Sequence, residues 1–330
     1  MVNVITFGSA TWDIFIRDKE LQFKKNKNFV TEKGVYFPLG AKIDIDEINF
    51  SSGGGGTNAA ATFSSQGIKT FYCGMIGSDP GGEEIIKVLN SLKVDTSLIS
   101  KTNNKFTNHS FVLSIPKKDR TILTYRGASE FMTYDDIPLS QLKRKTSNKS
   151  WFYLAPMNGR LSKTFEKIVD FGHSNNIKIA LNPGISQLKL PKKKLIKILK
   201  KTDILILNRE EASILTGISY KKDKEIFEKI KFFYPGIFAI TNGSQGAIVS
   251  DGVKKYSVGI LKSKVVDRTG AGDSFSAGFV SGIIKGKDIT YSIQLASANA
   301  TSCLREWGAK NGLLSAGQKF KKIKVIKSDA

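Results

Sequence analysis

Residues 265–279 read Val-Val-Asp-Arg-Thr-Gly-Ala-Gly-Asp-Ser-Phe-Ser-Ala-Gly-Phe, which predicts a strand end, a turn of small residues and the start of a helix. Gly270, Ala271 and Gly272 would let the backbone approach a ligand closely, and the free amides of a helix start suit phosphate oxygens. Asp273 could accept a proton from a substrate hydroxyl beside those amides. The same residues could equally form an ordinary turn and helix cap, so the stretch alone leaves both interpretations open.

Short apolar runs alternate with amphipathic segments along most of the chain, which is typical of strand-helix-strand units and a parallel sheet. The expected strands are residues 2–7, 70–75, 151–154, 178–181, 204–207 and 237–241. The expected helices include residues 83–89 and 165–173, whose apolar positions recur at three- and four-residue steps. No internal repeat or low-complexity linker divides the sequence, so we expect one α/β domain over residues 1–330, with a mainly parallel sheet flanked by helices.

Two stretches alternate apolar and polar residues with the period of a strand. One is residues 43–46. The other consists of residues 109–115 and 121–125, joined by a polar turn, and predicts a hairpin. Together these stretches predict a small antiparallel β lid, formed roughly by residues 14–50 and 105–130.

The string Asp-x-Thr-Gly-Ala-Gly-Asp-Ser-Phe, followed by Ala-Gly-Phe, closely resembles the signature of the ribokinase-like (PfkB) carbohydrate kinase family. Further stretches resemble other motifs of the family and occur in the family's order, at residues 8–13, 53–58, 77–82, 208–211 and 241–246. Two departures leave the substrate preference open: Arg268 stands where small polar residues are common, and residues 182–184 read Asn-Pro-Gly instead of Asp-Pro-Asn. The resemblance implies a ribokinase-like fold.

The resemblance also implies an activity. We expect an ATP-dependent kinase that transfers the γ-phosphoryl group to a hydroxymethyl group of a small sugar, ribose-like or fructose-like. A nucleoside kinase of the adenosine type and a 2-keto-3-deoxygluconate kinase are the alternatives within the family. A non-catalytic nucleic-acid-binding or regulatory protein that has kept the kinase fold is an alternative of a different class.

The family's functional residues can be placed on this sequence position by position. The resemblance implies that Asp273 is the catalytic base, assisted by the turn of Gly270, Ala271 and Gly272. The implied substrate-binding residues are Asp13, Gly53, Gly54 and Asn58. The implied nucleotide-binding residues are Asn208, Thr241, Gly243, Gly246 and Asn299. Asn208 and Glu211 would organise Mg²⁺ largely through water, and K⁺ is the candidate for a monovalent-cation site at Asp267, Thr269 and Gly308.

Arg126 follows the returning strand of the expected hairpin, which in the family leads toward the acceptor site. If the side chain of Arg126 points inward, its planar donor fork favours a carboxylate or phosphate, and a sugar acid becomes competitive with a neutral sugar. If it points outward, it is a solvated charge. Neutral sugars remain the first expectation, because no second fixed cation can be placed in the site from the sequence.

The formal net charge of +22 raises the question of nucleic-acid binding. The lysines are scattered over several stretches and no aromatic-studded recognition motif accompanies them, so we expect solvated helix faces and no nucleic-acid partner. A relaxed dinucleotide fingerprint at Gly54, Gly56 and Ala59 follows the expected lid strand instead of the first strand, which disfavours a dehydrogenase. No P-loop string occurs.

The sequence favours a cytoplasmic protein with no membrane partner. Its first residues read as a strand and lack the pattern of a secretory signal, and no apolar run approaches the roughly 18 to 20 residues that cross a bilayer. Cys73 and Cys303 lie far apart and have no metal-ligand spacing, so we expect reduced core thiols. The edge of the lid sheet could pair with the lid of a second protomer in a homodimer.

Overall fold

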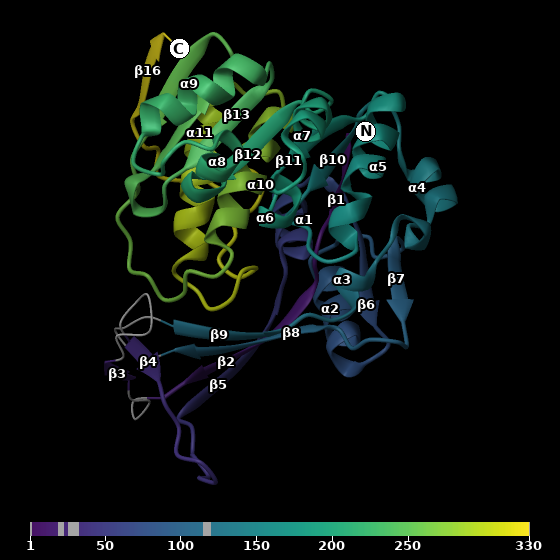
Figure 1. Cartoon of the computed structure of the whole chain (residues 1–330), viewed down its shortest axis with the longest axis vertical. Coiled ribbons are helices and arrows are strands. Elements are labelled where there is room, and N and C mark those ends of the chain that lie inside the picture. The colour runs from purple at the N-terminus through teal and green to yellow at the C-terminus, as the bar shows by residue number, and fades with distance from the viewer. Residues whose placement is uncertain (1, 19–22, 26–32, 115–119, 330) are drawn as a thin grey trace.

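A ten-stranded sheet runs through the computed structural model, which describes residues 2–18, 23–25, 33–114 and 120–329 (Figure 1). The strand order is β16-β15-β14-β13-β12-β11-β10-β1-β6-β7. The strands in sequence order are β1 (Asn3–Phe7), β6 (Lys69–Gly77), β7 (Ile99–Thr102), β10 (Ser150–Leu154), β11 (Lys178–Leu181), β12 (Ile204–Asn208), β13 (Ile237–Thr241), β14 (Ala247–Ser250), β15 (Lys254–Val258) and β16 (Val325–Asp329). All neighbours from β7 to β13 pair in parallel, whereas β14, β15 and β16 extend the sheet antiparallel.

Helices cover the sheet because successive strand residues face opposite sides and both sides are apolar. In β1, Ile5 joins a cluster with α5, α7, α8 and α9, whereas Val4 joins one with α1 and α10. The helices are α1 (Gly55–Ser65), α2 (Pro80–Ser91), α3 (Ala128–Phe131), α4 (Leu139–Lys145), α5 (Leu161–Ser174), α6 (Ile185–Leu188), α7 (Lys192–Leu199), α8 (Arg209–Thr216), α9 (Asp223–Phe233), α10 (Ala271–Ile284) and α11 (Ile289–Cys303), with 3₁₀ turns at Tyr134–Asp136 and Gly243–Gln245. No helix within the described ranges is both long and apolar enough to cross a bilayer.

A smaller sheet projects from one end of the large one, at the bottom of Figure 1. Its order is β5 (Glu47–Gly53), β2 (Thr11–Arg17), β8 (Asn108–Ser114) and β9 (Arg120–Tyr125). The outer pairs β5–β2 and β8–β9 are antiparallel, and the central pair β2–β8 is parallel. A separate antiparallel pair is formed by β3 (Phe23–Lys25) and β4 (Lys33–Val35).

The structure confirms the predicted fold class, and all six predicted strands of the large sheet are present with small shifts at their ends. The prediction of a strand at residues 43–46 is wrong. Those residues are exposed and β5 begins at Glu47, whose partner Arg17 is the last residue of β2. A strand forms only where a neighbouring strand can complete its hydrogen bonds. Most of the predicted polar hairpin turn lies outside the described residues, between β8 and β9.

Candidate active site

The first turn of α10 presents a carboxylate that is not used to cap the helix. The N-cap of α10 is Gly270, which is left-handed with φ 75° and makes no side-chain cap. A Cβ on Gly270 would lie 2.2 Å from the Cβ of Ala309, so the turn requires glycine for its close approach to the chain after α11. Asp273 instead accepts a hydrogen bond of 2.8 Å from Nδ2 of Asn58 at its Oδ2. The interpretation of Asp273 as a simple helix cap is therefore excluded.

Asn58 lies in the first turn of α1, so the contact between Asn58 and Asp273 brings two helix starts together. A Cβ built on Gly55 would lie 3.6 Å from Oδ1 of Asp273, which places the beginning of α1 beside the second carboxylate oxygen. Burial raises the pKa of Asp273, while the hydrogen bond from Asn58 and the charge of Lys310 act against that rise. A carboxylate with a raised pKa is a stronger base, as proton transfer from a hydroxyl requires.

Lys310 is a component of this site that sequence reasoning did not identify. Its side chain is almost fully buried, and its Nζ donates one hydrogen bond of 2.7 Å to the backbone oxygen of Ser52 and another of 2.7 Å to Oδ1 of Asn58. Burial lowers the pKa of Lys310, against the charges of Asp13 and Asp273, which raise it. The only signal in the sequence was its position directly after Gly308 and Ala309, in a segment already assigned to the site.

The substrate-binding candidates Asp13, Gly53, Gly54 and Asn58 lie close together in the structure. Asp13 is buried on β2, and a Cβ on Gly53 would lie 1.9 Å from its Oδ2, so Gly53 leaves room for the carboxylate. Gly54 has φ 94°, and a Cβ there would lie 2.4 Å from the backbone oxygen of Ser9. Burial is the main cause that raises the pKa of Asp13, and a hydrogen bond with Ser110 opposes it.

Asn208 and Thr241 sit at the carboxyl ends of neighbouring strands β12 and β13, where they are register partners. Asn208 caps α8: its Oδ1 accepts from the backbone N of Glu211 at 2.8 Å, and Oε2 of Glu211 accepts from the backbone N of Asn208 at 2.8 Å. Burial raises the pKa of Glu211 to about 7, with smaller contributions from the charges of Glu210 and Asp273. The negative charges of Glu211 and Asp273 therefore interact with each other.

The model of the pfkB family of carbohydrate kinases matches residues 28–316, which is most of the chain. The chain belongs to the pfkB family of carbohydrate kinases. A relative described as an uncharacterized sugar kinase, from Archaeoglobus fulgidus, is 30% identical over 248 residues, covering 75% of this chain and 96% of the relative. The ribokinase of Bacillus subtilis is 27% identical over 313 residues, covering 95% of this chain and 96% of that enzyme.

Solved structures show the same fold for this pfkB-family kinase. The structure of Arabidopsis thaliana ribokinase complexed with ribose and ATP matches it with a TM-score of 0.76 at 23% identity, covering 95% of this chain and 96% of that one. The family membership makes the protein an ATP-dependent phosphotransferase that acts on a sugar or a related compound. The predicted family, fold and enzyme class are thereby confirmed.

The three residues expected at a monovalent-cation site lie together in this pfkB-family kinase. Oδ1 of Asp267 accepts hydrogen bonds from the backbone N of Thr269 at 3.0 Å and from its Oγ1 at 2.9 Å, and Oδ2 accepts from the backbone N of Gly308 at 3.1 Å. Asp267 thus joins the turn before α10 to the segment after α11. Among the described residues, no group of three or more His, Cys, Asp and Glu side chains could hold a metal ion.

Two of the expected contact residues are placed differently from the rest. Asn299 is fully buried on α11, where its Nδ2 donates to the backbone oxygen of Ser274 at 2.9 Å and its Oδ1 accepts from the backbone N of Leu314 at 2.9 Å. Both ends of its amide are occupied, so Asn299 anchors α11 to the start of α10.

Arg126 has a side chain that is 59% exposed and forms an ion pair of 2.6 Å with Glu130. The side chain of Arg126 is therefore largely exposed and already has an acidic partner.

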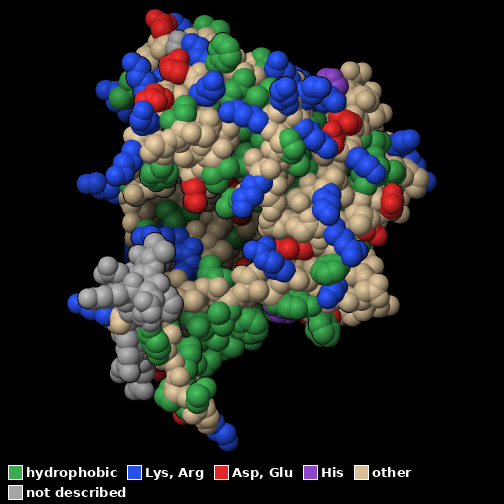
Figure 2. All heavy atoms as spheres, in the orientation of Figure 1, with side chains coloured by type: hydrophobic (Ala, Val, Ile, Leu, Met, Phe, Trp, Pro, Cys, Tyr) green, Lys and Arg blue, Asp and Glu red, His purple; other side chains and the backbone are tan. Residues whose placement is uncertain are grey.

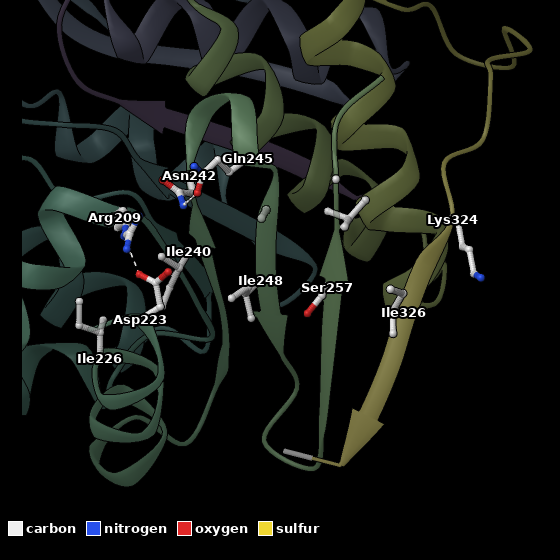
Figure 3. A pocket seen from close by; sticks show the side chains of 13 residues that line it. Arg209, Asp223, Ile226, Ile240, Asn242, Gln245, Ile248, Ser257, Lys324 and Ile326 are labelled. Atoms are coloured by element: carbon white, nitrogen blue, oxygen red, sulfur yellow. Dashed lines mark hydrogen bonds and ion pairs between the residues drawn. The ribbon is translucent and has the colours of Figure 1, made fainter. Parts of the chain in front are cut away.

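A hollow of about 380 Å³ lies at the antiparallel end of the large sheet (Figure 3). Its floor is a row of register partners across four strands: Ile240, Ile248, Ser257 and Ile326. One end is formed by the ion pair of Arg209 and Asp223 and by the loop of Asn242 and Gln245. None of the residues around Asp273 lines this hollow, so it is not the site where a hydroxyl would meet the base.

Proposed function

We propose that this pfkB-family kinase transfers the γ-phosphoryl group of ATP to a hydroxymethyl group of a small neutral sugar, ribose-like or fructose-like, with Asp273 as the base. The observation that carries the proposal is the cluster of the half-buried Asp273 with the buried Asn58, Asp13 and Lys310 beside two helix starts. Such a cluster offers a proton acceptor, hydroxyl-binding groups and backbone amides in one place.

In the proposed reaction, the substrate hydroxyl donates its proton to Asp273 as its oxygen bonds to the γ-phosphorus of ATP, and the bond between that phosphorus and the β,γ-bridging oxygen breaks to release ADP. Asp13 and Asn58 hold other hydroxyls of the sugar, and Gly53 and Gly54 allow the sugar to approach the backbone. The amides of Gly270, Ala271 and Gly272 at the start of α10 stabilise negative charge on the transferring group. Positioning and electrostatic stabilisation are the main contributions that a protein makes to phosphoryl transfer.

We place the nucleotide at the strand ends that carry Asn208 and Thr241, and beside the turn of Gly243 and Gly246. Both glycines have positive φ, 50° and 93°, and a Cβ on Gly246 would lie 1.9 Å from the backbone oxygen of Val258. This turn can therefore approach a ligand without side chains in the way.

Asn208 and Glu211 fit a Mg²⁺ ion held through water. Carboxylate and amide oxygens are the ligands that this hard cation accepts, and because burial raises the pKa of Glu211, a nearby cation would favour its charged form. Mg²⁺ would neutralise charge on the phosphates. Asp267, Thr269 and Gly308, which are linked by hydrogen bonds, would hold K⁺ beside the anion-binding turn.

The charges in the described part of the site favour a neutral acceptor. Two carboxylates, Asp13 and Asp273, face a single cation, Lys310, whose Nζ already donates to Ser52 and Asn58. Arg126, the other candidate clamp, is exposed. A sugar acid such as 2-keto-3-deoxygluconate would add a negative charge without a free partner, which is costly in a buried site.

A nucleoside acceptor is the second candidate, favoured by one observation. The face of β2 that carries Asp13 also carries Phe15 and Arg17, which line a hollow of about 170 Å³ together with Trp307. Phe15 and Trp307 have ring centroids 5.6 Å apart, and the guanidinium of Arg17 lies 4.2 Å from the Trp307 ring centre. Aromatic surface of this kind suits a nucleobase.

An ATP-consumption screen with ribose, fructose, adenosine and 2-keto-3-deoxygluconate separates these possibilities. We expect turnover with a neutral sugar and less than about a tenth of that rate with the acid, one power of ten being about 1.4 kcal/mol of transition-state binding. Activity on adenosine alone would replace the sugar by a nucleoside. Activity on the acid alone would contradict the charge argument.

We propose a homodimer through the outer face of the small sheet. Phe50, Ile14, Phe111 and Leu123 form a row of register partners across its four strands, and the rings of Trp12 and Phe50 stack with centroids 6.4 Å apart. Figure 2 shows hydrophobic side chains gathered over this part of the molecule. The exposed members of this face include Ile48, Phe50, Phe111, Leu123 and Tyr125. A contiguous apolar face of this kind is typical of an interface with a second copy.

We infer no nucleic-acid partner and a cytoplasmic location. On the face drawn in Figure 2, the Lys and Arg side chains are scattered and are interrupted by hydrophobic and acidic ones, which supports solvated charge over a continuous binding stripe. Cys73 and Cys303 are both buried and free, which fits a reducing compartment.

A further inference from the structure

The buried side chain of Lys310 joins three parts of the chain that are distant in sequence. Its Nζ donates to the backbone oxygen of Ser52 at the end of β5 and to Oδ1 of Asn58 on α1, and Lys310 itself lies in the segment after α11. From Asn58 the chain of hydrogen bonds continues to Oδ2 of Asp273 on α10. The side chains of Lys310, Asn58 and Asp273 therefore form one linear network.

With Lys310 charged and Asp273 ionised, the state in which Asp273 can act as a base, the chemistry of the network fixes the direction of every hydrogen bond. An ammonium group can only donate and an ionised carboxylate can only accept, whereas an amide does both. Asn58 must therefore turn its oxygen toward Lys310 and its NH₂ group toward Asp273. A rotated amide would place NH₂ against the ammonium and oxygen against the carboxylate, replacing two attractions with two repulsions.

We propose that Lys310 is a positioning residue for the reaction: it locks the amide of Asn58 and, through that amide, fixes which oxygen of Asp273 is free to receive the substrate proton. Oδ2 of Asp273 is occupied by Asn58, so Oδ1, which lies beside Gly55 at the start of α1, is the accepting atom. Without the lysine, the amide can rotate and the carboxylate loses its fixed direction. A base displaced by about an ångström can lose roughly 100-fold in rate.

This inference rests on the proposed role of Asp273 as the base, and a double-mutant cycle tests the two separately. The variants are Lys310→Met, which keeps the apolar stem and removes the donor, Asn58→Ala, and their combination. Lys285→Met is the matched control, because Lys285 is a partly buried lysine that donates to Gln66 at 2.9 Å in another part of the molecule. Thermal melting establishes that each variant is folded before its kinetics are measured.

We expect Lys310→Met to lower kcat about tenfold or more, with KM for ATP changed less than about twofold. In the Asn58→Ala background the same substitution should change kcat less than about twofold, because its effect runs through Asn58. Full additivity of the two substitutions, or an unchanged kcat in folded Lys310→Met, would overturn the proposal. If Lys310→Met does not fold, Lys310→Gln, which keeps a polar end in the same buried place, is measured in the same cycle and judged by the same criterion.

The pH profile gives a readout that a merely structural lysine would not move. Lys310 lowers the pKa of Asp273, so its removal should shift the acid limb of kcat/KM to higher pH. The other titratable groups that interact with Asp273 or Lys310 are Asp13 on β2, Tyr153 on β10, Glu211 on α8 and Cys303 on α11, and all of them stay in place in Lys310→Met. Lost stability with an unshifted limb would assign Lys310 to packing. Near-normal kcat in Asp273→Asn would instead remove the base, a failure of the proposed function that is distinct from the failure of the lysine.

Discussion

Asp273→Asn isolates the proposed basic function of one carboxylate without changing the volume of its side chain. The amide oxygen of the new asparagine can still accept from Nδ2 of Asn58, which now lies 2.8 Å from Oδ2. This partly buried hydrogen bond is therefore retained, and what is lost is the proton acceptor. A positioned general base contributes about 10² to 10⁴ in rate, so we expect kcat to fall by at least about 100-fold, or roughly 3 to 5 kcal/mol in the barrier.

The measurement is steady-state ATP consumption with the acceptor that the substrate screen identifies. KM for ATP should change little, because the nucleotide is expected at the ends of β12 and β13. Asp170→Asn is the matched control, since Asp170 is a partly exposed carboxylate on α5 paired with Lys201. That control should retain parent activity. If Asp273→Asn kept more than about a third of the parent kcat, the carboxylate would not be the base.

Three further outcomes are expected. Gly53→Ala should raise KM for the sugar at least about tenfold, because the new Cβ would lie 1.9 Å from Oδ2 of Asp13. The control is Gly259→Ala, which should leave KM unchanged in the same kinetic assay because no atom lies within 4 Å of its new Cβ. The acid limb of the kcat/KM profile should lie above pH 4, the ordinary range of a carboxyl group, because burial raises the pKa of Asp273. The base is protonated and lost as the pH falls through that raised pKa. An acid limb at or below pH 4 would contradict the role of Asp273 as the base. We expect the parent protein to be a dimer and Phe50→Glu a monomer in sedimentation or light scattering, and a monomeric parent or an unchanged mass would exclude this face as the interface.

The sequence was sufficient to predict the parallel strands of the large sheet except β7, because strands such as β10 and β12 are short, almost wholly apolar runs between amphipathic helices. The edge strand β7, Ile-Ser-Lys-Thr, is short and half polar and was not predicted. The antiparallel extension was not predicted. β15 reads Lys-Lys-Tyr-Ser-Val, and the edge strand β16 reads Val-Ile-Lys-Ser-Asp. Their polar residues hide the alternation of a strand, and their pairing joins segments far apart in the chain.

In the candidate site too, local motifs predicted individual residues but not the contacts between distant parts of the chain. Asp273 and Asn58 could be identified from local motifs, but their contact spans 215 residues and follows only from the fold. Lys310 could not be recognised, because in a chain with 51 lysine and arginine residues nothing local distinguishes a buried lysine from a solvated one. Asn299 is the opposite case. Its position in the sequence suggested a nucleotide contact, but both ends of its side-chain amide form hydrogen bonds with the backbone.

The central position of β1 has a consequence for the order of events during synthesis. This first strand lies between β6 and β10, so roughly 140 further residues must be synthesised before both of its neighbouring strands exist. The interval between the synthesis of Asn58 and that of Asp273 is longer still, about 10 to 40 s at translation rates of about 5 to 20 residues per second. Throughout that interval the nascent chain exposes apolar strands without their partners. This dependence on late, non-local pairing predicts slow folding and a nascent chain that is prone to aggregation until the later strands are made.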